Sequence, residues 1–66
     1  MSVSDREIVT TAKLTIERHG KGAAYFAARM ADELHELGDL QGARVWLKIF
    51  EAIDKMLAAE PGGSAN

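Results

Sequence analysis

Residues 19–22, His-Gly-Lys-Gly, are of types that could bind an anion. Backbone amides at the start of a helix, with a lysine beside them, can hold a phosphate or a carboxylate. Lys21, Gly22 and Ala23 therefore form a candidate anion site. A Walker loop is excluded, because it needs a longer glycine-rich loop, a Gly-Lys-Ser/Thr ending and a preceding strand. The favoured interpretation is a joint in which one glycine ends a helix and the other begins the next.

Asp32, His35 and Glu36 are spaced three and four residues apart, as metal ligands on a helix can be. The zinc-protease pattern His-Glu-x-x-His is not completed, because its last position is Asp39. These residues are expected to form a solvated polar face, and no metal or cofactor is predicted. His19 is expected to be a half-buried histidine with satisfied hydrogen bonds, since nothing in the sequence pairs with it.

Residues for nucleophilic catalysis are scarce. The chain has no cysteine, and its serines lie near the two termini. Thr10, Thr11 and Thr15 lie on a predicted helix without an adjacent general base. Three short helices rarely enclose a cleft of enzymatic size, so the protein is predicted not to be an enzyme.

Helical periodicity and capping signals predict three helices, over about residues 4–20, 22–37 and 39–59. Ser4 and Glu7 form a capping-box pattern at the start of the first helix, and Asp39 is a good N-cap for the third. The fold class is therefore all-α: a compact three-helix domain over residues 1–59 with tight joints. A flexible tail over residues 60–66 follows, because Pro61 stops the last helix.

The third helix has an unusually wide apolar face. A surface helix normally shows an apolar stripe of roughly 100°, so the extra width predicts a second covering surface. The expected interface, through which the protein would form a homodimer, consists of Val45, Trp46, Ile49, Phe50, Ile53 and Met56. On the second helix the main apolar stripe is expected at Phe26, Met30, Leu34 and Leu37. Beside it, small residues at Ala24, Ala28 and Ala31, and Gly42 on the third helix, are expected to let another helix approach closely.

Composition bounds the class of protein. The chain has 66 residues, of which 47% are hydrophobic, and this share is too high for a disordered chain. A domain this small often needs a disulfide, a metal or a partner chain, and association is the device that this sequence leaves open. The N-terminus lacks the pattern of a signal peptide, and no apolar run is long enough to span a bilayer. A cytoplasmic location is expected.

The leading functional hypothesis is a cytoplasmic helical module that binds other proteins, including a second copy of itself. The alternative is a small helix-turn-helix-like DNA-binding regulator, with Gln41, Arg44 and Lys48 at the exposed start of its recognition helix. The net charge of −2, the scattered basic residues and the very tight turn at Gly38 disfavour nucleic acid. A membrane-surface role is disfavoured as well, because acidic residues interrupt both faces of the third helix.

Several short motifs occur in a recognisable order over residues 5–57. They are Asp5-Arg6-Glu7-Ile8, His19-Gly20, Ala24, Ala28, Ala31-Asp32-Glu33-Leu34, Gly38-Asp39, Gly42, Val45-Trp46, Ile49 and Ala52-Ile53. In this order the chain resembles a family of small alphaproteobacterial proteins without an assigned function. The resemblance implies a small helical bacterial protein, and it brings no activity, cofactor or catalytic residue.

Overall fold

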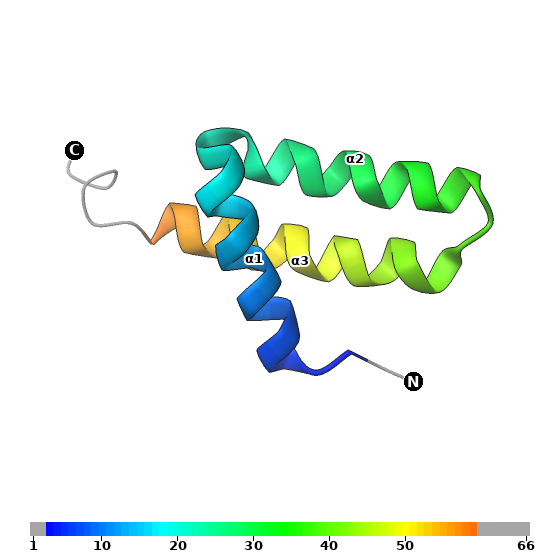
Figure 1. Ribbon diagram of the computed structural model, residues 1–66, viewed down its shortest axis with the longest axis horizontal. Coiled ribbons are helices and arrows are strands. Elements are labelled where there is room, and N and C mark those ends of the chain that lie inside the picture. Colours follow the sequence, from blue (N-terminus) through cyan, green and yellow to red (C-terminus); the bar gives the residue numbers. More distant parts are fainter. Residues whose placement is uncertain (1–2, 60–66) are drawn as a thin grey trace.

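The computed structural model describes residues 3–59, and these residues are almost entirely helical (Figure 1). The elements are α1 (Asp5–His19), the 3-10 turn η1 (Gly20–Gly22), α2 (Ala23–Glu36) and α3 (Leu40–Ala58). No strand occurs within this range, so the all-α prediction is confirmed. The predicted tail over residues 60–66 lies outside the described residues.

The prediction of three separate helices needs a correction. Helical residues run without a break from Asp5 to Glu36, because the joint between α1 and α2 is itself a turn of 3-10 helix. Within residues 3–59 there are therefore two uninterrupted helical stretches, and the first of them bends sharply at η1 (Figure 1).

The start of α1 has the capping box that the sequence predicts. The amide of Glu7 donates to Ser4 Oγ over 3.2 Å, and the amide of Ser4 donates to Glu7 Oε1 over 3.1 Å. Two amides that lack partners within the helix are thus satisfied by side chains. The first turn also carries Asp5 and Glu7, whose charges suit the positive end of the helix dipole.

Gly20 makes the bend after α1. It has φ 57° and ψ −129°, and its amide donates to the carbonyl of Ile16. The positive φ agrees with the expected glycine stop, but ψ lies outside the left-handed helical region. Residues with a Cβ rarely adopt this conformation, so the direction in which α2 leaves α1 depends on a glycine at this position.

Asp39 caps α3 through its carboxylate, which accepts a hydrogen bond of 2.9 Å from the amide of Gly42. Gly42 was expected to allow the close approach of another helix, but the atoms nearest to it belong to Asp39 of its own helix. A Cβ at this position would lie 2.6 Å from Asp39 Oδ2 and 2.9 Å from Asp39 Cγ. Gly42 therefore leaves space for the capping carboxylate of its own helix.

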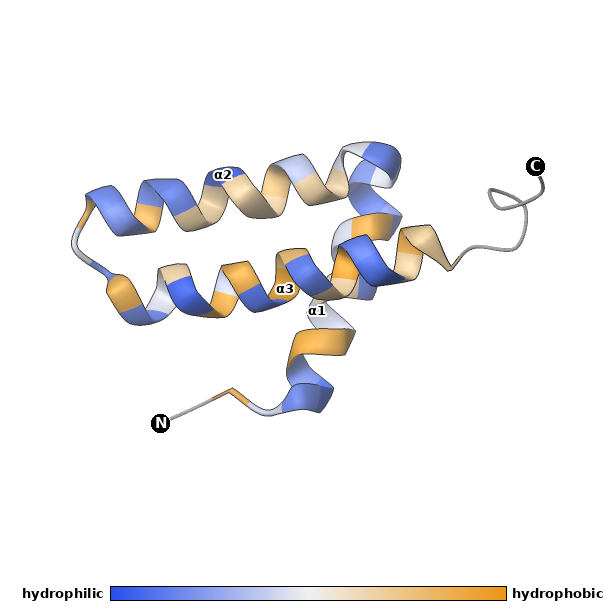
Figure 2. Cartoon of the chain, turned by 180° about the vertical axis from the view of Figure 1, so that it is seen from behind, coloured by the Kyte–Doolittle hydropathy of each residue, from blue (hydrophilic) through white to orange (hydrophobic). Residues whose placement is uncertain are grey.

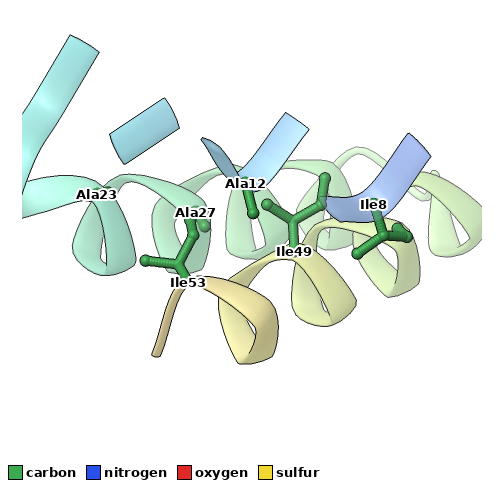
Figure 3. Packing of buried hydrophobic residues seen from close by; sticks show 6 residues of the cluster. All are labelled: Ile8, Ala12, Ala23, Ala27, Ile49 and Ile53. Carbon is green, nitrogen blue, oxygen red and sulfur yellow. The ribbon is translucent and has the colours of Figure 1, made fainter. Parts of the chain in front are cut away.

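Helices α2 and α3 form an antiparallel hairpin, and α1 crosses one side of it (Figure 1). The core lies where the three meet. Figure 3 shows side chains from all three helices converging there: Ile8, Ala12, Ala23, Ala27, Ile49 and Ile53. Half of this cluster is alanine, and Ile53 is the largest side chain that is fully buried. The helices therefore pack with their backbones close together, and few large side chains are buried between them.

The apolar stripe of α2 differs from the prediction. Ala23, Ala27 and Ala31 are the buried residues of this helix. The larger residues expected there lie at its edges, and Leu37 is 80% exposed. The reason is steric: small side chains let α2 lie close to α3, and this closeness leaves no room for large residues between the two axes.

Candidate interaction surface

The six residues predicted as an interface do not share one surface. Ile49 is 3% exposed and Ile53 is fully buried, because Ile8 and Ala12 of α1 cover this side of α3. These two side chains belong to the chain's own core and are not available to a partner. Part of the second covering surface that the wide apolar face of α3 predicts is thus supplied by α1.

The other four residues of that set, Val45, Trp46, Phe50 and Met56, are partly buried and pack against the edge of the core. Trp46 meets Phe26 of α2 edge to face, with ring centroids 5.8 Å apart and an interplanar angle of 80°. Such aromatic pairs contribute stability beyond the area that they bury. Each of these four side chains still presents part of its surface to solvent.

His19 is exposed, and the expectation that it is half-buried is wrong. Its ring stacks on Phe26 with centroids 4.2 Å apart and an interplanar angle of 17°. His19, Phe26 and Trp46 therefore form a continuous aromatic row from the end of α1 across α2 to α3. The row links the end of α1 to both helices of the hairpin.

Two open grooves flank the line along which α1 crosses α3. One has a volume of about 430 Å³ and the other about 510 Å³. Val3 and Val45 line both grooves. Because Val45 lines the grooves and Ile49 contacts α1 in the core, the side of α3 that carries these two residues faces α1.

The three candidate DNA contacts, Gln41, Arg44 and Lys48, are exposed and lie along the first of these grooves, next to the start of α1. The helices before and after Gly38 run antiparallel (Figure 1). In the helix-turn-helix motif the two helices cross at about 90–120°. The hairpin thus does not have the geometry of that motif, although the three polar side chains do lie together.

The side of α3 that faces away from α1 carries exposed apolar residues. At ~100° per residue, Leu40 and Leu47 lie opposite Val45 and Ile49. Leu40 is 55% exposed and Leu47 is 50% exposed, and the partly buried Phe50 lies between this row and α2. From the sequence alone, Leu47 is only one residue among many on a wide apolar helix. The seven-residue spacing of the two leucines is the signal that marks them as a separate row.

Helix α2 contributes small residues to the same side of the hairpin. Phe26 points toward the end of α1, and at ~100° per residue the opposite side of α2 holds the alanine stripe. Seen from behind (Figure 2), α2 and α3 lie in front, and no other described segment covers them. We name this surface the open face, and its apolar residues are Ala24, Ala28, Leu40, Leu47 and Phe50. At ~100° per residue the exposed His35 lies beside the two alanines and the exposed Glu51 lies beside the two leucines.

Charges of opposite sign border the open face on its two sides. The outer edge of α2 carries Asp32 and Glu36, whereas the outer edge of α3 carries three cations, Arg44, Lys48 and Lys55, with Glu51 among them. All six side chains are exposed. The ion pair between Arg29 and Glu33, with 3.1 Å between Nη2 and Oε2, lies within α2 and leaves these charges unengaged.

The candidate anion site at Lys21, Gly22 and Ala23 is weakened by the structure. The amide of Ala23 donates to the carbonyl of Gly20, so it is not free to bind an anion. Because η1 runs directly into α2, the first turn of α2 already has a helical turn before it. Lys21 is exposed beside this joint, and the stretch acts as a helical corner.

The described residues were also searched for a metal site, a reactive threonine and a membrane-spanning helix. No group of three or more His, Asp or Glu side chains in this range is placed to hold a metal ion. Thr15 is buried, and its hydroxyl donates to the carbonyl of Thr11 over 2.7 Å, which satisfies it within the helix. Within residues 3–59 no helix combines the length and the hydrophobicity that crossing a membrane requires.

Comparisons with known proteins add no relative to this picture. No protein-family model matches the chain, and no curated protein or solved structure matches it either. The resemblance to a family of small alphaproteobacterial proteins therefore stays a prediction from the sequence, and the open face remains the feature of the fold that bears most directly on function.

Proposed function

We propose that the protein is a small cytoplasmic module for protein–protein interaction that carries no enzymatic activity and works as a homodimer. The observation that carries this proposal is the open face: a side of the hairpin with two exposed leucines and a row of alanines that no described part of the chain covers. In a dimer this surface would be buried, and the exposed charges would lie at the rim of the contact.

The small core supports the proposal. Within residues 3–59, five of the eight buried hydrophobic residues are alanines, and Ile8, Ile49 and Ile53 are the larger ones. An alanine removes little apolar area from water compared with a leucine or an isoleucine, so this core supplies a small hydrophobic stabilisation. A chain of 66 residues without a disulfide gains most from a second source of buried area, and a second copy supplies one.

The exposed apolar residues support it as well. Leu40 and Leu47 are at least half exposed and lie on one side of α3, together with Phe50. Single exposed apolar side chains are normal on a protein surface, whereas a contiguous group of them marks a contact site. The alanines beside them keep this surface flat enough for a second helix to lie across it.

A concentration series of thermal melts tests the proposal. If folding is coupled to association, the melting temperature rises with protein concentration, because the dimer is favoured over two unfolded chains by mass action. Circular dichroism over a hundredfold range of concentration gives the measurement. A melting temperature that stays constant over the whole range would show that the monomer folds alone and would count against the homodimer.

A further inference from the structure

We propose that two copies of the chain associate through the open face to form a four-helix bundle, in which α2 of each copy lies on α3 of the other. This inference rests on the proposed homodimer and specifies its surface and its symmetry. The two-fold axis runs parallel to the helices, between the two stacked hairpins.

The shape of the open face selects this arrangement. Its apolar residues on α2 are small, Ala24 and Ala28, with His35 nearer the turn, and those on α3 are larger, Leu40, Leu47 and Phe50. If α2 lay on α2 and α3 on α3, small residues would meet small ones and large residues would meet large ones. With α2 on the α3 of the second copy, side chains from α3 enter the spaces above the alanines, as ridges enter grooves. A two-fold dimer makes this contact twice.

The heights of the residues agree with this packing. In an antiparallel hairpin, residues equally far from the Gly38–Asp39 turn lie at the same height. An axis parallel to the helices preserves this height in the second copy. Ala28 of one copy then lies between Leu47 and Phe50 of the other, at the middle of both helices.

The charges that border the open face are complementary in the same arrangement. Asp32 lies as far before the turn as Arg44 and Val45 lie after it, so it reaches the height of Arg44 in the second copy. In the alternative two-fold dimer, α2 would lie on α2 of the second copy and α3 on α3. The acidic edges of the two copies would then meet, and so would the two basic edges. Exposed charges of this kind select register and partner more than they supply affinity.

Asp54 lies at the end of the open face, at the height of the first turn of α2. The positive end of a helix dipole favours a carboxylate there, so this acidic residue does not oppose the packing.

Two equally exposed leucines provide the first test. Leu47 is 50% exposed on the open face, whereas Leu14 is 51% exposed on α1, outside it. Leu47→Glu should weaken the dimer about 30-fold or more, as the loss of a central contact does, and Leu14→Glu should leave the dissociation constant unchanged. Sedimentation equilibrium gives the constants, and circular dichroism shows whether each variant is folded.

A charge exchange provides the second test, and it uses exposed residues whose replacement leaves the fold intact. At low salt, Asp32→Lys and Arg44→Glu should each weaken the dimer by roughly tenfold, since each change occurs at two symmetric sites. The double variant should restore most of the wild-type affinity. A dimer that survives Leu47→Glu would refute the open face, and a double variant as weak as the single ones would refute the pairing of α2 with α3. A wild-type monomer would refute the homodimer itself, together with this inference.

Discussion

Gly20 and Gly22 stand on either side of Lys21, yet the chain needs them for different reasons. Gly20 has a positive φ of 57°, whereas Gly22 has φ −85° and ψ 3°, which other residues adopt without strain. Apart from the adjacent residues and the local helix backbone, no described atom lies within 4 Å of a Cβ built at either position. The difference between the two glycines is therefore one of backbone conformation alone.

Gly20→Ala should lower the free energy of unfolding by about 1–3 kcal/mol, because alanine is strained at this φ. Gly22→Ala, the matched control, should leave it unchanged or raise it by about 0.4–1 kcal/mol, because alanine reduces the entropy of the unfolded chain. Urea unfolding followed by circular dichroism measures both. Equal effects of the two substitutions would mean that the bend does not depend on the conformation of Gly20.

Asp39 and Gly42 act as a pair at the start of α3. Alanine favours a helix over glycine by about 1 kcal/mol, but at position 42 its Cβ would displace the carboxylate that caps the helix. Gly42→Ala should therefore change stability little in the wild type, because the gain in propensity offsets the loss of the cap. In an Asp39→Ala background the same substitution should stabilise by about 1 kcal/mol. Additive effects in this double-mutant cycle would contradict the coupling.

The close contact between α2 and α3 depends on the alanines that face α3. Ala27→Leu should destabilise the fold by about 1–3 kcal/mol, because extra methylenes in a packed contact force the two helices apart. Ala58→Leu adds the same atoms at an exposed position of α3 and should have little effect. Thermal melts at one protein concentration compare the two. A tolerated leucine at position 27 would mean that the hairpin is packed more loosely than described.

Sequence reasoning succeeded where a structure is set by neighbours in the chain. The Ser4–Glu7 capping box and the Asp39 cap follow from residues three positions apart, and both are present. The breadth of the apolar face on α3 indicated burial from several sides, and α1 and α2 supply two of them, while the expected contact with a second chain stays a prediction. Such features need no knowledge of how the helices cross.

The division of that apolar face could not be read from the sequence. Which side of α3 receives α1 depends on the direction that the chain takes after Gly20, and a single glycine does not specify that direction in advance. The interface prediction therefore mixed Ile49 and Ile53, which α1 covers, with Phe50, which borders the open face. The sequence also did not show that alanines, and not Phe26 and Leu34, face α3. Which residues face α3 depends on the distance between the axes of α2 and α3, which the sequence does not give.

Taken as a whole, the molecule is a hairpin with α1 across one side and the open face on the other (Figures 1 and 2). α1 contributes Ile8 and Ala12 to the core, and no described segment does the same on the opposite side. A second copy would complete this arrangement, because the open face joins small and large residues and opposite charges in one surface. The proposed association would thus connect this fold to the proposed function.

The molar mass in solution is the most direct test of that step. Size-exclusion chromatography with light scattering at micromolar protein should give twice the 7.2 kDa of the chain, with the mass falling toward that of one chain on dilution. Leu47→Glu should give the mass of one chain under the same conditions, with its helices retained by circular dichroism. A wild-type chain that elutes as a stable, folded monomer of 7.2 kDa at every concentration would contradict the homodimer and the bundle built on it.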